Sequence, residues 1–267
     1  MSAQVKTLIL RTAGTNCDEE TAFAFQQAGA RATKRHVNVL RQDPDILLNY
    51  DILAIPGGFS YGDDLGAGTV LANELITLLR DALNRFVESG RLVIGICNGF
   101  QVLVKTGLLP AMDRWRQEVT LTMNDSHKFE DRWTNLTAPR SKCVLVEDDE
   151  QFYLPVAHAE GKFVPADEDT LRRLRNNGQI VLCYADESGN TDVGYPANPN
   201  GSVADIAAIC DPTGRILGMM PHPERHVLPY HHPRWTREGL EEVGDGCVLF
   251  RRAVEFIQSH PVRDACQ

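Results

Sequence analysis

A short apolar run, Leu92–Ile96, ends at Cys97, and this cysteine stands between Gly95 and Gly99. The run predicts a buried strand and the following residues favour a helix, so the segment predicts a strand–nucleophile–helix turn. Glycines are needed on both sides because larger side chains beside so tight a turn would clash. The turn would aim the sulfur at the amino end of the next helix, where backbone N–H groups and the helix dipole favour a thiolate.

Strands and helices alternate through the first 110 residues or so. The predicted strands are Val5–Arg11, Arg31–Val37, Asp51–Ile55 and Leu92–Ile96, and the predicted helices are Asp18–Ala28 and Thr69–Glu88. This alternation is typical of βαβ units with right-handed crossovers and a parallel sheet. Ligands bind beyond the carboxyl ends of the strands in such sheets, so the loops after Ile55 and Ile96 mark the expected site.

Short strands dominate the rest of the chain. We predict strands at Gln117–Met123, Cys143–Val146, Val156–His158, Ile180–Tyr184, Ala204–Cys210 and Ile216–Met220, with helices at Glu168–Arg175 and Cys247–Gln258. We interpret these strands as antiparallel additions to the same sheet. The expected fold is therefore α/β: a three-layer, open, mostly parallel sheet with antiparallel additions, forming a single domain over residues 1–267.

Charge and cysteine usage exclude several classes of protein. The formal net charge of −9 argues against a binder of nucleic acid or of anionic membranes, which needs a basic surface. The chain shows neither a signal peptide nor an apolar run of membrane-spanning length. Its seven cysteines show no CxxC pair and no metal-like clustering with histidine, so we expect a cytoplasmic protein with reduced thiols.

A cysteine nucleophile needs a base and a group that orients the base. The segment Pro221-His222-Pro223-Glu224 follows a predicted strand, which places His222 at a sheet edge again. Pro223 biases His222 toward an extended conformation, in which residues i and i+2 project to the same side. Glu224 would then reach one ring nitrogen of His222 and leave the other for Cys97.

The nucleophile also needs hydrogen-bond donors for the oxyanion. Gly58 follows the predicted strand that ends at Ile55, and glycine lets the backbone approach a ligand closely. The amide of Asn98, next to Cys97, is the second expected donor. Each of these signals alone has a simpler explanation, such as a core cysteine or an ordinary turn, but their combination favours a catalytic site.

Two other groups of residues invite a functional interpretation that we do not adopt. Cys17 lies beside Asn16 and Asp18, and we interpret it as a helix-start residue because no paired base is apparent. Residues 225–237 hold three histidines, but no carboxylate or cysteine stands at ligand spacing. We therefore expect a solvated loop there and no metal site.

The residues around Cys97 and His222 resemble the class I, or triad, glutamine amidotransferases. The resemblance covers the Gly95–Gln101 and Pro221–Glu224 segments. Four further stretches resemble the branch of this family that serves purine biosynthesis: they are Gly14–Asp18, Pro56–Asp64, His158–Phe163 and Asn198–Ser202. Together these motifs span residues 14 to 224, and the resemblance implies the flavodoxin-like architecture of the family.

The resemblance implies hydrolysis of L-glutamine to glutamate and ammonia through a cysteinyl thioester. Cys97 would be the nucleophile, His222 the base and Glu224 the residue that orients the base. Gly58 and Asn98 would form the oxyanion hole, and Gln101 matches a family position that contacts the substrate glutamine.

The same resemblance implies a partner for this chain. An ATP-dependent synthetase would use the ammonia to convert formylglycinamide ribonucleotide into its amidine. The chain has no phosphate-binding loop, so we expect no cofactor in it and place ATP and magnesium on a large synthetase subunit, joined by a small bridging subunit. Three alternatives stay open: a stand-alone glutaminase, another cysteine hydrolase of the superfamily, and a non-catalytic regulatory subunit.

Overall fold

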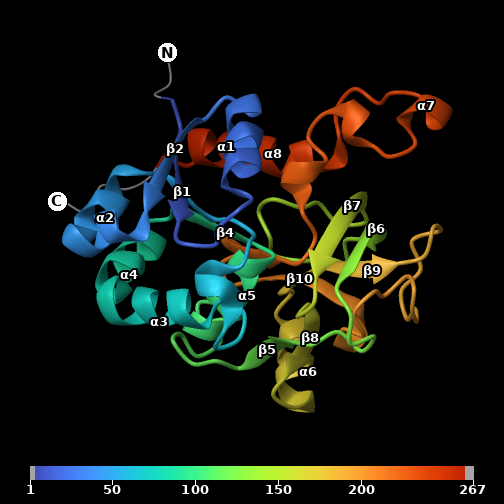
Figure 1. The fold of residues 1–267 in the computed structure, drawn as a ribbon, viewed down its shortest axis with the longest axis horizontal. Helices are drawn as coiled ribbons and strands as arrows, with labels where there is room; N and C mark the ends of the chain where they lie inside the picture. Colours follow the sequence, from blue (N-terminus) through green and yellow to red (C-terminus); the bar gives the residue numbers. More distant parts are fainter. Residues whose placement is uncertain (1–3, 262–267) are drawn as a thin grey trace.

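In the computed structural model, which describes residues 4–261, the main sheet has nine strands (Figure 1). They are β1 (Lys6–Arg11), β2 (Arg31–His36), β3 (Ile52–Ile55), β4 (Leu92–Ile96), β6 (Glu130–Thr137), β7 (Gln151–His158), β9 (Ile180–Ala185), β10 (Ile206–Cys210) and β11 (Ile216–Met219). Their order across the sheet is β2-β1-β3-β4-β11-β10-β9-β6-β7. The pairs from β2 to β11 are parallel and those from β11 to β7 are antiparallel, which confirms the mixed sheet predicted from the sequence.

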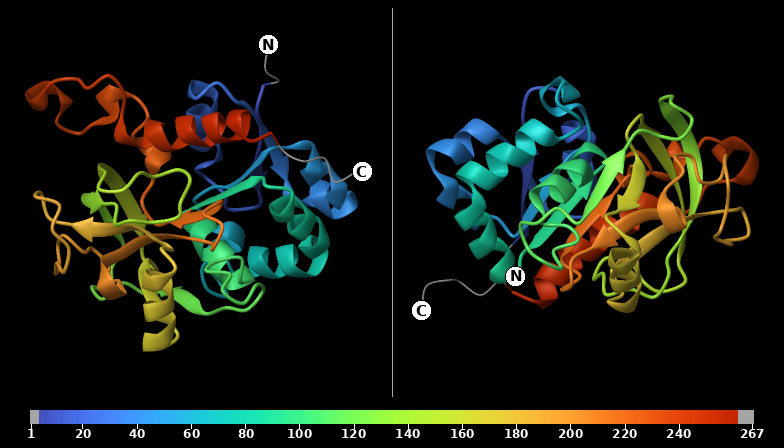
Figure 2. Two further views of the ribbon diagram at one scale, coloured as in Figure 1. Left: turned by 180° about the vertical axis from the view of Figure 1, so that it is seen from behind. Right: turned by 90° about the horizontal axis from the view of Figure 1, so that it is seen from below.

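Helices cover both faces of the parallel part of the sheet (Figures 1 and 2). One face carries α1 (Asp18–Gln27) and α8 (Asp245–Ser259), which meet through an edge-to-face contact of Phe25 and Phe250 at 5.0 Å between ring centroids. The other face carries α3 (Thr69–Leu78), α4 (Arg80–Glu88) and α5 (Asn98–Thr106). The three layers of the α/β prediction are therefore confirmed. None of the helices within residues 4–261 has the length and apolar character needed to cross a bilayer.

Smaller elements lie around this frame. Helix α2 (Val37–Gln42) follows β2, and α6 (Glu168–Asn176) lies beside a separate ribbon formed by β5 (Val119–Thr122) and β8 (Lys162–Pro165). The segment that carries α7 (Trp235–Glu238) projects from the body of the molecule (Figures 1 and 2).

The structure corrects three predictions about single elements, which are the segments 117–123, 143–146 and 69–88. The segment 117–123 does contain a strand, β5, but it does not join the main sheet, because β5 pairs antiparallel with β8 and packs against α5. Cys143–Val146 is a largely buried turn. The N–H of Val144 donates to the carbonyl of Gly214, and the N–H of the preceding Lys142 donates to that of Gly178. Burial without strand pairing explains its apolar run.

The predicted long helix Thr69–Glu88 is divided at Leu79 into α3 and α4. The hydroxyl of Thr77 donates to the carbonyl of Asn73 at 2.7 Å, and such a bond to the preceding turn bends helices. Leu79 itself leaves the helical region, with φ −122° and ψ 3°. After this division α4 packs mainly against the segment η1 (Pro44–Asn49), with its apolar side chains buried.

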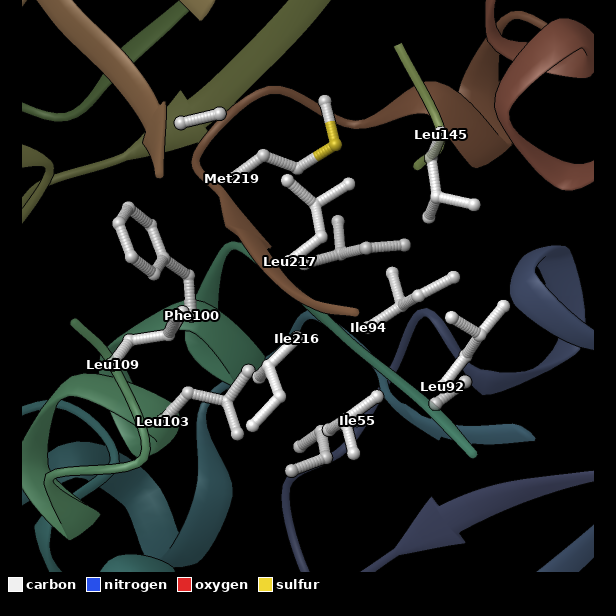
Figure 3. Close-up of a cluster of buried hydrophobic side chains, with 14 of the residues drawn as sticks. Ile55, Leu92, Ile94, Phe100, Leu103, Leu109, Leu145, Ile216, Leu217 and Met219 are labelled. Carbon is white, nitrogen blue, oxygen red and sulfur yellow. The ribbon is translucent and has the colours of Figure 1, made fainter. Parts of the chain in front are cut away.

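One hydrophobic core contains side chains of β4, which ends at Cys97, and of β11, which precedes His222. Figure 3 shows side chains of β4, β11 and α5 packed together, and Phe100 of α5 faces β11. A Cβ atom on Gly218 would lie 2.2 Å from Cδ2 of Phe100, so this helix packs directly on the backbone of β11. Close packing of this kind fixes the two strand ends relative to each other.

Candidate active site

Cys97 occupies a sharp turn between β4 and α5. Its backbone has φ 50° and ψ −106°, a conformation that is strained for a residue with a side chain. A Cβ on Gly95 would lie 2.6 Å from the carbonyl oxygen of Gly99, and one on Gly99 would lie 1.9 Å from that of Ile55. The predicted need for glycine on both sides of Cys97 is confirmed, because backbone atoms occupy that space.

His222 and Glu224 form a buried pair just beyond β11. Nδ1 of His222 lies 2.6 Å from Oε1 of Glu224, and both residues are 2% exposed. The pair was expected on an extended segment, but the turn η4 (Pro223–Arg225) brings the two side chains together instead. The N–H of His222 also donates to the carbonyl of Pro155 at 2.8 Å, which holds this turn against β7.

The surroundings of His222 favour its charged form. Burial opposes protonation, but the carboxylate of Glu224 and the sulfur of Cys97 outweigh it and raise the pKa of His222 well above its ordinary value. The opposite holds for His158, where burial and the charge of His222 lower the pKa to about 3. The first imidazole can therefore carry a proton, whereas the second stays neutral.

The loop after β3 lies directly beside these residues. A Cβ on Gly57 would lie 2.8 Å from Cε1 of His222 and 3.5 Å from Cβ of Cys97. Gly58 follows with φ 143°, packed against the loop that contains Gly14. Within residues 4–261, the N–H groups of Gly58 and Asn98 donate to no protein acceptor, as the proposed oxyanion donors require.

Gln101 lies one helical turn after Cys97, and its side chain is held at both ends. Its Nε2 donates to the carbonyl of Glu160 at 2.5 Å, and its Oε1 accepts from Nδ2 of Asn98 at 2.9 Å. Asp63 also accepts from Nδ2 of Asn98, at 3.3 Å. This network ties the start of α5 to the loops that surround it.

Two of the motif loops are bonded to each other near the end of β7, where the carbonyl of Ala157 accepts from the sulfur of Cys97 at 3.7 Å. Nδ2 of Asn200 donates to the carbonyl of Gly161 at 2.9 Å, and the N–H of Phe163 donates to the hydroxyl of Ser202 at 3.0 Å. The fully buried side chain of Asn124 lies in the same network. Its Oδ1 accepts from the N–H of Gly161 at 3.0 Å, and its Nδ2 donates to the carbonyl of His158 at 2.8 Å. The sequence analysis missed Asn124, because a lone asparagine in a turn carries no distinctive signal.

Cys17 begins α1, which confirms the prediction of a helix-start residue, but it also lies beside a possible base, which was not expected. Its Sγ lies within 4.8 Å of a ring nitrogen of His222 and of a carboxylate oxygen of Glu224. Nη2 of Arg225 donates to the same sulfur at 3.2 Å. Cys17 follows β1, so the rule that parallel strand ends share one edge of the sheet would have brought it to the site.

Cys17, His222 and Glu224 are also the one group of potential metal ligands within the described part of the chain. The guanidinium of Arg225 lies against Cys17 and repels a cation there, so the arrangement is poorly suited to a metal ion. The histidines of the 225–237 segment form no such group. His226 is buried rather than solvated, with its ring 5.1 Å from that of Trp133.

Comparison with known proteins agrees with the fold. The model of the CobB/CobQ-like glutamine amidotransferase domain matches residues 4–257, and the chain belongs to this family. Within it, the phosphoribosylformylglycinamidine synthase subunit PurQ of Dehalococcoides mccartyi is 52% identical over 255 residues, or 95% of this chain and 98% of that protein. The PurQ subunit of Methanococcus maripaludis is 42% identical over 264 residues, or 94% of this chain and 97% of that protein.

A solved structure extends the similarity. The structure of PurLQS from Thermotoga maritima contains a chain that superimposes with a TM-score of 0.72 at 28% identity. The match covers 95% of this chain and 99% of that one. The similarity therefore includes the antiparallel part of the sheet as well as its parallel part.

Proposed function

We propose that this chain is the glutaminase subunit of a phosphoribosylformylglycinamidine synthase, which hydrolyses L-glutamine and supplies ammonia to a synthetase subunit. The observation that carries the proposal is the buried His222–Glu224 pair, 2.6 Å apart, beside a cysteine on a strained strand–helix turn. The relatives named PurQ and the PurLQS structure support the same assignment.

In the first half of the reaction, the sulfur of Cys97 attacks the side-chain amide carbon of glutamine. His222 takes the thiol proton, and the carbonyl oxygen becomes an oxyanion that accepts hydrogen bonds from the N–H groups of Gly58 and Asn98. His222 then gives a proton to the departing nitrogen, so that ammonia leaves and a γ-glutamyl thioester stays on Cys97. Glu224 keeps the imidazole oriented and stabilises its positive charge.

In the second half, water hydrolyses the thioester. His222 accepts a proton from the water as its oxygen attacks the thioester carbon, and the same two N–H groups stabilise the second oxyanion. Collapse of this intermediate breaks the carbon–sulfur bond, releases glutamate and returns the proton to Cys97. Gln101, at the first turn of α5, contacts the substrate in this scheme.

The ammonia goes to an ATP-dependent synthetase that converts formylglycinamide ribonucleotide into formylglycinamidine ribonucleotide. In this proposal a large synthetase subunit holds ATP and magnesium, a small subunit bridges the complex, and this chain needs no cofactor for its own hydrolysis. The complex works in the cytoplasm. The proposal rests on the PurLQS relative for the identity of the partner subunits.

Glutamate release tests the proposal. The chain is assayed with L-glutamine alone, and then with its synthetase subunits, ATP and formylglycinamide ribonucleotide. We expect strong stimulation by the complete mixture, with one glutamate released for each amidine formed. High activity that the partner leaves unchanged would identify a stand-alone glutaminase. The absence of glutamate under both conditions would reject a glutaminase of either kind.

A further inference from the structure

Cys17 is a buried thiol for which the reaction described above has no use, and its sulfur is fixed from several sides. The residue is 1% exposed, and its N–H donates to the carbonyl of Gly57 at 3.2 Å. The thiol donates to Oδ1 of Asn16 at 3.1 Å and accepts from Nη2 of Arg225 at 3.2 Å. These contacts give the sulfur one defined position in the site.

That position is beside the imidazole of His222. The Cα atom of Gly57 faces Cε1 of His222, the sulfur of Cys17 and the Cβ of Cys97, because a Cβ built on it would lie within 3.5 Å of all three. The Cε1 edge of the ring, between its two nitrogens, is thus flanked by Gly57 and by two cysteines. Nε2 of His222 is buried at this edge, and it has no well-aligned hydrogen-bond partner within the described part of the chain.

We propose that Cys17, held by Arg225, is a positioning residue that keeps Nε2 of His222 directed at Cys97. This inference rests on the proposed role of His222 as the base. The bond from Nδ1 to Glu224 fixes one side of the ring but permits it to tilt about that contact. The sulfur of Cys17, within 4.8 Å of a ring nitrogen and of a carboxylate oxygen of Glu224, gives the ring a second support that restricts this tilt. Sulfur is large and polarisable, so it suits both the neutral and the protonated ring.

Arg225 connects the support that Cys17 gives to His222 with the support that Glu224 gives to it. The turn η4 (Pro223–Arg225) carries both Glu224, which bonds Nδ1 of the imidazole, and Arg225, which donates to the sulfur of Cys17. A movement of this turn would therefore shift both supports of His222 together. The same guanidinium occupies one side of the Cys17 sulfur. Cys17 also begins a helix, as the N-cap of α1, but its backbone, with φ −98° and ψ 17°, lacks the strained turn of Cys97. These differences favour a supporting role over a second nucleophile.

The test uses the complete complex and measures kcat and KM for glutamine in Cys17→Ala, Cys17→Ser and Arg225→Ala. Small displacements of catalytic groups reduce rates by up to about 100-fold, so we expect kcat of Cys17→Ala to fall about 10- to 100-fold. KM should change less than about threefold, since the substrate contacts stay in place. Serine should restore part of kcat, and Arg225→Ala should lower it in the same direction. Cys183→Ala, which removes another buried thiol on β9, is the matched control and should keep the kcat of the parent.

Several results would overturn the inference. Unchanged kcat in Cys17→Ala would do so, as would a rise in KM alone, which would place Cys17 in substrate binding. Labelling with a glutamine-mimicking electrophile, followed by mass spectrometry, should modify Cys97 alone; modification of Cys17 would make it a nucleophile. Arg225 is only half-buried, so Arg225→Ala gives an independent reading if Cys17→Ala fails to fold. If the parent complex releases no glutamate, the proposed function fails rather than this inference.

Discussion

The N–H of Cys97 donates to the carbonyl of Met219 at 2.7 Å, so the end of β4 is bonded directly to the end of β11. Met219 stands three residues before His222, and the two strands are paired in parallel up to this point. Cys97 and His222, the proposed nucleophile and base, therefore come from neighbouring strand ends that share one hydrogen-bond ladder and one packed core. Their relative position depends on the sheet rather than on a loop.

Replacing Cys97 by alanine should abolish glutamine-dependent amidine formation, since no other group takes the place of the sulfur. Loss of a nucleophile in a catalytic triad reduces rates by a factor of at least about 1,000. Synthesis from added ammonium chloride should continue, because the acceptor site lies on the partner in our proposal. Both activities are measured in one complex; loss of both would mean that Cys97 is needed for assembly or folding.

Replacing Glu224 by glutamine should lower both kcat and the pKa of His222. The carboxylate is the main group that raises this pKa against the effect of burial, and the amide keeps the shape without the charge. In a comparable triad the change from carboxylate to amide reduces kcat about 10,000-fold. NMR titration of the histidine resonances checks the pKa, and steady-state assays check kcat. A His222 pKa equal to that of the parent would contradict the assigned role of Glu224.

The fold could be predicted where the sequence pattern is local. Leu92–Ile96 is apolar throughout because β4 is buried on both faces, and the glycines beside Cys97 mark a turn that backbone sterics require. Cys143–Val146 has the same apolar character, yet it forms a turn, because burial alone does not say whether a backbone pairs with a neighbouring strand. The separate β5–β8 ribbon depends on such long-range pairing as well.

The site residues also differ in whether the local sequence could predict them. His222 and Glu224 are close in sequence and could be recognised together, although the turn that joins them could not. Cys17 and Arg225 are 208 positions apart, and only the folded sheet edge brings their side chains together. Asn124 is a stronger case, because its side chain bonds three backbone groups and the imidazole of His158, and most of these partners are distant in the sequence.

Replacing Gly57 by alanine should reduce glutaminase kcat together with a moderate loss of stability. The new methyl group would lie 2.8 Å from Cε1 of His222 and 3.1 Å from Sγ of Cys17, so the imidazole must move. We expect kcat to fall by up to about 100-fold and the free energy of unfolding to fall by about 1–3 kcal/mol. Gly194→Ala is the matched control, because a Cβ there meets nothing within 4 Å. Equal kcat in the two variants would show that the added methyl group displaces the loop around Gly57 and leaves His222 in place.

Replacing Gly99 by alanine should destabilise the protein, even though alanine is favoured over glycine within helices by about 1 kcal/mol. The added Cβ would lie 1.9 Å from the carbonyl oxygen of Ile55, and this backbone atom belongs to β3 and cannot rotate away. We expect a net loss of about 3 kcal/mol or more, because the overlap outweighs the gain in helix propensity. Urea denaturation measures the change. A variant as stable as the parent would mean that α5 can move away from β3.

His158 should make the protein lose stability as the pH falls below neutrality. Burial and the nearby charge of His222 lower its pKa to about 3 in the folded state, whereas an exposed histidine titrates near ~6.5. Between these values the unfolded chain binds the extra proton and the folded chain does not. The free energy of unfolding therefore decreases by about 1.4 kcal/mol for each pH unit between roughly 6 and 3 from this residue alone.

The variant His158→Gln isolates this contribution, because glutamine can donate a hydrogen bond toward Asn124 but does not titrate. It should be less stable than the parent at pH 7, yet its stability should depend less steeply on pH between 6.5 and about 4.5. Urea denaturation at several pH values gives the slope of the free energy of unfolding against pH for each protein. The contribution of the carboxylates is common to both proteins, so it cancels in the difference between the two slopes. His127→Gln, at an exposed histidine, should keep the slope of the parent. If the free energy of unfolding had the same pH dependence in His158→Gln and in the parent, His158 would take up its proton in the folded state as well. The conclusion that its imidazole is neutral would then be wrong.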